Sequence, residues 1–106
     1  MLFELRQYHI RPGKQAEWVA LMEEEIIPFQ SSQGMVILGS FTEEEDESVY
    51  IWIRRFKDEE ERKAQYAAVY ESDTWTNQIG PKIPDLMERE QIKVRRLNPT
   101  AKSAIQ

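Results

Sequence analysis

Hydrophobic and polar residues alternate near the start of the chain, and this period of two predicts a β-strand over residues 2–11. Pro12-Gly13 breaks the strand, and a helical pattern then runs from about Lys14 to Phe29. Its apolar stripe consists of Trp18, Met22, Ile26 and Phe29 at helical spacing. Pro28 predicts that this first helix ends there, before a loop.

The middle of the chain predicts a β-hairpin followed by a second helix. Residues 35–42 and 48–56 are rich in β-branched and aromatic types, and the acidic run 43–47 between them suits a solvated tip. Strands joined by so short a connection pair antiparallel. The second helix begins at Asp58, whose side chain can accept a hydrogen bond from the N–H of Glu61 in a capping box.

The second helix carries two surfaces of different chemistry. Ala64, Ala67 and Ala68 form a small-residue face that would allow close packing on a sheet. Arg62, Tyr66 and Tyr70 lie along a second stripe, which could border a pocket.

A short helical turn from Asp73 and a last strand over residues 86–97 complete the pattern. The element order is therefore β-α-β-β-α-β. This order is typical of an α+β, ferredoxin-like fold, in which helices cover one face of an antiparallel sheet.

The length of 106 residues predicts one domain. We assign residues 1–98 to that domain and residues 99–106 to a C-terminal tail. The chain has no cysteine, which excludes disulfides, thiolate nucleophiles and cysteine metal sites. A strand that begins at residue 2 leaves no room for a leader, and no stretch approaches the ~18 apolar residues of a membrane span. We therefore expect a cytoplasmic protein, and the net charge of −5 argues against a nucleic-acid partner.

Strand residues of opposite parity differ in their chemistry. One set is aliphatic and is expected to face the helices: Leu5, Val36, Leu38, Val49, Ile51, Ile53, Ile92 and Val94. The other set mixes aromatic and charged side chains: Glu4, Arg6, Tyr8, Ile37, Phe41, Tyr50, Trp52, Arg54, Gln91 and Lys93. We expect the second set on the open face of the sheet, where exposed aromatic residues and arginines mark a dimer interface or a ligand surface.

Several short motifs, in their order along the chain, resemble the NIPSNAP family of the dimeric α+β barrel superfamily. Phe3-Glu4-Leu5-Arg6-Gln7-Tyr8, followed by Arg11-Pro12-Gly13-Lys14, is similar to that family's first strand and its entry to the first helix. Val49-Tyr50-Ile51-Trp52 resembles its third strand. Ser72-Asp73-Thr74-Trp75 is similar to its Asp-Pro-Glu-Trp turn, although Thr74 replaces an acidic residue and the proline is missing.

The resemblance implies a homodimer in which two four-stranded sheets face each other and close a barrel. Two hypotheses on function follow. The first is a binding or interaction module, with a small hydrophobic molecule as its ligand. The second is a cofactor-independent monooxygenase or isomerase that acts on a small hydrophobic or aromatic metabolite. An enzyme needs a water-excluding pocket with converging polar groups, whereas a module can have a filled interior.

The candidate pocket or interface consists of Glu4, Arg6, Tyr8, His9, Tyr50, Trp52 and Arg54. Glu4 and Arg6 lie two apart on one strand face, which favours an interfacial ion pair with Tyr8 as a hydroxyl partner. Alternatively they could orient a carboxylate or enol substrate, with Tyr8 as proton donor. Trp52 suits the centre of a dimer interface or a stacking surface for a flat substrate, and Arg54 could serve either role.

The chain offers few residues for a metal or a cofactor. His9 is the only histidine, and a position on the first strand does not suit a haem ligand. The acidic run 43–47 lacks the glycine and the spacing of an EF-hand loop. No phosphate loop or nucleophile elbow is present. We therefore predict no metal and no cofactor.

Overall fold

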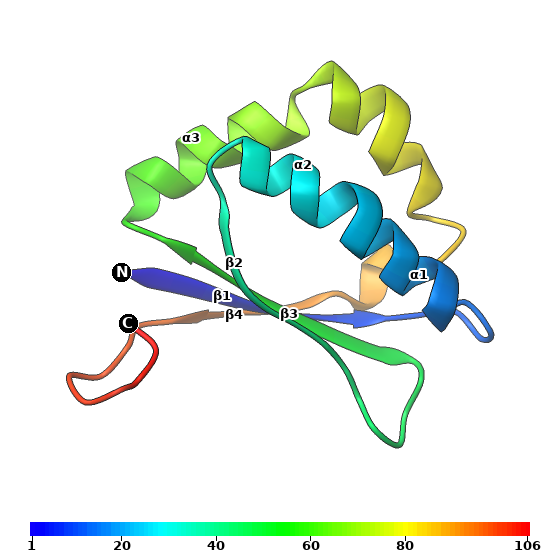
Figure 1. Ribbon diagram of the computed structural model, residues 1–106, viewed down its shortest axis with the longest axis horizontal. Helices are drawn as coiled ribbons and strands as arrows, with labels where there is room; N and C mark the ends of the chain where they lie inside the picture. The colour runs from blue at the N-terminus through cyan, green and yellow to red at the C-terminus, as the bar shows by residue number, and fades with distance from the viewer.

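The computed structural model describes all residues, Met1–Gln106, and contains a four-stranded antiparallel sheet with the helices on one of its faces (Figure 1). The strands are β1 (Leu2–His9), β2 (Val36–Thr42), β3 (Val49–Phe56) and β4 (Lys93–Leu97), in the spatial order β2-β3-β1-β4. The helical segments are α1 (Gln15–Leu21), η1 (Met22–Ile26), α2 (Ile27–Ser32), α3 (Glu59–Tyr70), η2 (Thr74–Ile79), η3 (Gly80–Lys82) and η4 (Arg89–Gln91). The predicted α+β, ferredoxin-like fold is confirmed.

The first helix runs through Pro28 instead of ending there. Pro28 lies in the first turn of α2, directly after the wide, π-type turn η1. Because the helix is continuous here, Pro28 lies inside it and its missing N–H removes one hydrogen bond to the preceding turn, and the wide turn η1 lies directly before this position. The helix ends near Gly34, whose φ of 98° turns the chain toward β2.

Two other element ends differ in detail from the sequence patterns. Asp58 caps α3 as predicted, because its Oδ1 accepts from the N–H of Glu61 at 2.9 Å. The side chain of Glu61 accepts a hydrogen bond from the N–H of Lys57 at 3.1 Å. In a capping box this bond would come from the N–H of Asp58, one residue later. β4 is shorter than the predicted strand over residues 86–97, since Met87 forms only an isolated bridge.

The sheet faces the helices with the opposite side from the one predicted. The residues of the aromatic and charged set that are buried under the helices are Glu4, Tyr8, Tyr50, Trp52 and Arg54. The rings of Tyr8 and Tyr50 pack edge-on against Trp18 of α1, with centroids 5.7 and 5.9 Å apart. Ile51 and Ile53, from the aliphatic set, lie on the other side and are partly exposed. The predicted assignment was wrong because it ignored the polar groups that the helices supply.

The helix α3 contributes to this reversal. Ala64, Ala67 and Ala68 are exposed, so the prediction that they pack on the sheet was wrong. The hydroxyls of Tyr66 and Tyr70 instead reach the guanidinium of Arg54 on β3, at 2.8 Å each. The stripe of tyrosines therefore faces the sheet.

The side of the sheet away from the helices, the open face, carries aliphatic residues in its middle, Leu5, Ile51 and Ile53, and basic residues on β4, Lys93 and Arg95. A bulge between Ile37 and Gly39 shifts β2, so that Phe41 lies opposite Ile51 on this face and is 53% exposed. A Cβ at Gly39 would lie 2.4 Å from the ring of Phe41, which explains the glycine there. The C-terminal tail covers one end of the face, where the carbonyl of Gln106 accepts from Arg55. None of the helices has the length and hydropathy needed to cross a membrane.

Candidate functional site

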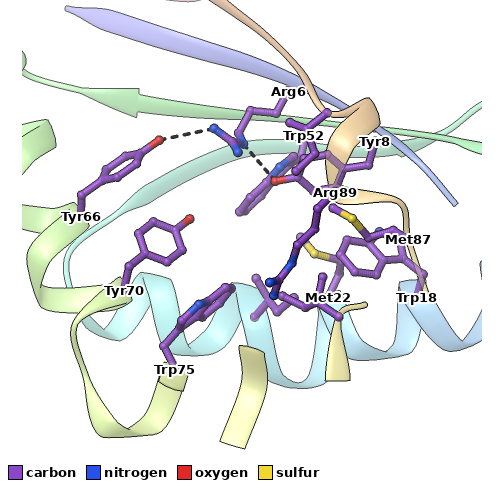
Figure 2. Close-up of a pocket in the computed structure, with 13 residues that line it drawn as sticks. Arg6, Tyr8, Trp18, Met22, Trp52, Tyr66, Tyr70, Trp75, Met87 and Arg89 are labelled. Carbon is purple, nitrogen blue, oxygen red and sulfur yellow. Dashed lines mark hydrogen bonds between the residues drawn. The ribbon is translucent and has the colours of Figure 1, made fainter. Parts of the chain in front are cut away.

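A cavity of about 290 Å³ lies between the helix-facing side of the sheet and the helices (Figure 2). The strands supply Arg6, Tyr8 and Trp52, and the helical segments supply Tyr66, Tyr70 and Trp75. Of its 13 lining residues 11 are hydrophobic, and the two exceptions are Arg6 and the more exposed Arg89. A small volume, an apolar lining and a few polar groups are the features of a small-molecule site.

Arg6 lies between two tyrosines at the wall of the cavity (Figure 2). Its Nε donates to the hydroxyl of Tyr8 at 2.9 Å, and its Nη1 donates to the hydroxyl of Tyr66 at 3.4 Å. Burial acts to lower the pKa of Arg6, but the neighbouring Tyr8 oxygen outweighs it and the pKa lies above its ordinary value. The guanidinium therefore stays charged, although none of the ion pairs in the structure includes it.

Glu4 and Arg54 form a buried ion pair beside the cavity. They lie opposite each other on β1 and β3, and Arg54 Nη2 donates to Glu4 Oε1 at 2.7 Å. Arg62 of α3 donates to the second carboxylate oxygen at 2.8 Å. The hydroxyl of Tyr66 lies 2.9 and 2.7 Å from the two oxygens and donates to the carboxylate. Both oxygens of Glu4 are therefore occupied by protein donors.

Arg54 is surrounded by acceptors from both helices. Its Nη1 donates to Gln30 Oε1 at 2.9 Å and to the Tyr70 hydroxyl at 2.8 Å. The guanidinium carbon also lies 4.7 Å from the centre of the Trp52 ring, within the range of a cation–π contact. Burial acts to lower the pKa of Arg54, and the oxygens of Tyr70, Tyr66 and Glu4 reverse this effect and raise it. The group is thus held as a cation inside the domain.

The carboxylate of Glu4 has a pKa below its ordinary value of 4.5. Burial acts to raise this pKa, but the charge of Arg54 and the hydrogen bonds from Tyr66, Arg62 and Arg54 together outweigh burial. At a pH between the pKa values of Glu4 in the folded and unfolded states, the unfolded chain binds more protons than the folded chain. The stabilisation by Glu4 is therefore complete above pH 4.5 and is lost as the pH falls through the folded pKa.

An NMR titration of the Glu4 side-chain carboxyl should give a midpoint below 4.5, and a midpoint above it would contradict this assignment.

The structure separates the seven candidate residues into four groups. Arg6, Tyr8 and Trp52 line the cavity, and Glu4 and Arg54 form the buried pair next to it. Tyr50 lies in the core, where burial raises its pKa to about 12 despite a hydrogen bond with Ser40. His9 faces away from the cavity, opposite Val49 at the end of β1.

The predicted ion pair between Glu4 and Arg6 is absent, and the partners of Glu4 are Arg54 and Arg62. The interpretation of these residues as an exposed interface was also wrong, because Glu4 and Arg54 are 0% exposed. Glu4 and Arg6 point to the same side of one strand. A residue directly opposite Glu4 on the neighbouring strand lies closer to it than Arg6 does, and its side chain pairs with the carboxylate. A cross-strand partner therefore replaced the neighbour along the chain.

The sequence did not indicate some of the residues that complete the site. Gln30 and Arg89 had no motif around them, because they reach the site only through the packing of α2 and the turn η4. Tyr66 and Tyr70 were indicated by their helical stripe, and both line the cavity. No group of three or more Asp, Glu or His side chains lies close enough to hold a metal ion.

Comparisons with known proteins agree with the fold. A NIPSNAP family protein from Agrobacterium tumefaciens is 27% identical, with a TM-score of 0.87 over 99% of this chain and 98% of that chain. An uncharacterized NIPSNAP domain protein from Burkholderia xenovorans is 22% identical, with a TM-score of 0.86 over 97% and 98% of the two chains. An antibiotic biosynthesis monooxygenase is 18% identical, with a TM-score of 0.69 over 94% and 99% of the two chains, and shares the fold alone.

No curated protein matches the chain. The model of the NIPSNAP family matches residues 3–103, which is nearly the whole length and includes the strands that carry Arg6 and Trp52. The motifs of the first and third strands lie within this match. The chain belongs to the NIPSNAP family.

Proposed function

We propose that this chain is a small-molecule-binding protein whose ligand occupies the cavity between the sheet and the helices. The observation that supports this most directly is the lining, in which 11 of 13 residues are hydrophobic around a volume of about 290 Å³. Trp52 and Trp75 offer aromatic surfaces for stacking, and Arg6 and Tyr8 offer polar contacts. An interior that served only the stability of the fold would gain from filling such a space.

Thermal unfolding with a neutral aromatic probe, benzyl alcohol, tests this proposal. A ligand that binds only the folded state stabilises it by about 2.7 kcal/mol at a concentration of 100 times its Kd. We expect the probe to raise the Tm of the natural protein. We expect no response from Ile83→Trp, because Ile83 lines the cavity and is 5% exposed, so that the larger ring fills the space.

Ile105→Trp is the matched control, since Ile105 is 54% exposed in the C-terminal tail. This variant should respond to the probe like the natural protein. An equal response of Ile83→Trp would show that the probe binds elsewhere and would count against the cavity as the site.

The alternative function is a cofactor-independent monooxygenase or isomerase that uses the same cavity. The pair of Arg6 and Tyr8 favours it, because two hydrogen-bond donors at an apolar wall could stabilise an enolate. Incubation of a bound ligand with the protein in air, followed by chromatography, separates the two functions. A binding protein returns the ligand unchanged, whereas an enzyme gives an oxidised or isomerised product.

We also propose that two copies of the chain associate through the open face of the sheet. Leu5, Ile51 and Ile53 form the middle of this face, and Phe41 is exposed beside them. Contiguous apolar surface of this kind is rare on monomers and is typical of interfaces. Light scattering at micromolar concentration should give about twice the chain mass of 12.6 kDa.

A further inference from the structure

We infer that the ligand of the cavity is a small organic anion, a carboxylate attached to an aromatic or similar apolar body, and that Arg6 is its counter-ion. This inference rests on the proposed function, because it requires that the cavity holds a small molecule. It adds the charge of the ligand, its orientation and the residue that selects it.

The charges around the cavity are unbalanced. Arg6 and Arg89 are the only charged residues of the lining, and no carboxylate is among them. The carboxylate of Glu4 is already shared by Arg54, Arg62 and Tyr66. A half-buried guanidinium without a counter-ion is costly in an apolar setting, so an anion in the cavity would be favoured there.

The neutral polar groups of the lining also lack acceptors. The Tyr8 hydroxyl accepts from Arg6 and donates to no group of the protein. The Tyr70 hydroxyl, which also lines the cavity, accepts from Arg54 and Gln30 and likewise donates to no group of the protein. The site therefore presents donors in excess, which suits a carboxylate, because its two oxygens accept about four hydrogen bonds and donate none.

The rest of the lining limits the body of the ligand. The aromatic surfaces of Trp52 and Trp75 and the side chain of Met22 are apolar or weakly polar. The volume of about 290 Å³ lies just below the ~300–1,000 Å³ range of ligand pockets, which favours a single ring over a lipid chain or a fused ring system. The Nε and Nη1 groups of Arg6 already donate to the hydroxyls of Tyr8 and Tyr66, which leaves its Nη2 group to donate to the carboxylate.

The experiment compares three probes that share one ring: phenylacetate, the neutral phenylacetamide and the cationic 2-phenylethylamine. The three tryptophans of the chain, Trp18, Trp52 and Trp75, all line the cavity, so tryptophan fluorescence reports binding directly. We expect phenylacetate to bind at least tenfold more tightly than phenylacetamide, and the amine to bind least. In Arg6→Met the affinity for phenylacetate should fall by about 10- to 100-fold, with that for phenylacetamide unchanged.

Arg96→Met is the matched control, because Arg96 is an exposed arginine of β4 that lies outside the cavity and, being opposite Glu4, is not on the open face. It removes the same charge and should leave all three affinities unchanged. Arg6→Lys keeps the charge without the planar fork and should bind phenylacetate with intermediate affinity. The ratio of the affinities for phenylacetate and phenylacetamide in the natural protein tests the inference even if Arg6→Met does not fold.

The two proposals fail in different ways. Equal affinity for phenylacetate and phenylacetamide, or an unchanged preference in Arg6→Met, would overturn the anion inference and leave the cavity as a site for neutral molecules. If none of the probes binds, including benzyl alcohol, the proposed function fails and the inference fails with it.

Discussion

Glu4→Gln is expected to lower the free energy of unfolding by about 3–5 kcal/mol, because it leaves a buried guanidinium without its counter-ion. Arg54 is 0% exposed, and its ion-pair partner is Glu4. The amide of glutamine is close in size to the carboxylate, so the loss reports charge and hydrogen bonding instead of packing. Urea unfolding followed by circular dichroism measures the change.

Two controls define this result. Glu17→Gln removes an exposed carboxylate of α1 and should change the stability by less than about 0.5 kcal/mol. The double variant Glu4→Gln/Arg54→Met should cost less than the sum of the two single changes, since it also removes the stranded cation. Additive costs would mean that the two groups act independently, contrary to the 2.7 Å contact between them.

Trp52→Asp is expected to prevent folding, whereas Ile51→Asp should give a folded monomer. The two residues are neighbours on β3 and point to opposite faces of the sheet. Trp52 is 1% exposed and belongs to the main core, so an aspartate there creates a cavity and buries an unpaired charge, which together cost well over 4 kcal/mol. Ile51 lies on the open face, where a charge remains in water in the monomer and opposes association.

Circular dichroism and light scattering on both variants measure these outcomes. Ile51→Ser is the control for lost apolar surface without an added charge, and it should weaken the dimer less than Ile51→Asp. A folded Trp52→Asp variant would contradict the burial of this ring. An Ile51→Asp variant that remained a dimer would exclude the open face as the interface.

The sequence contained a signal for the buried pair of Glu4 and Arg54 that the alternation along each single strand did not reveal. Glu4 and Arg54 carry opposite charges on strands that pair antiparallel, and register places them directly opposite each other. Cross-strand pairs of opposite charge are a unit of sheet stabilisation, so this signal could have been recognised once the strand order was known. Arg6 was predicted as the partner of Glu4 because the two residues are two apart on one strand. That spacing places them on the same side of the strand but does not bring their charged groups into contact.

The assignment of the two sheet faces failed for a related reason. An aliphatic set was expected against the helices because burial of apolar surface is favourable, and charged residues were expected in water. The expectation that charged residues face water does not hold where the covering helices supply hydrogen-bond acceptors, as Gln30 and Tyr70 do for Arg54. A buried charge is then tolerated, and the aliphatic side of the sheet is left for another surface.

The sequence by itself determined the elements, their order and the family. Local signals sufficed for this, because the strand alternation, the helical stripe of Trp18 and Met22, and the cap at Asp58 each depend on residues close along the chain. Only the tertiary structure decided which face is covered, where the cavity lies and that Arg6 has no carboxylate partner. These properties depend on contacts between residues far apart along the chain, such as Glu4 with Tyr66, which no local pattern records.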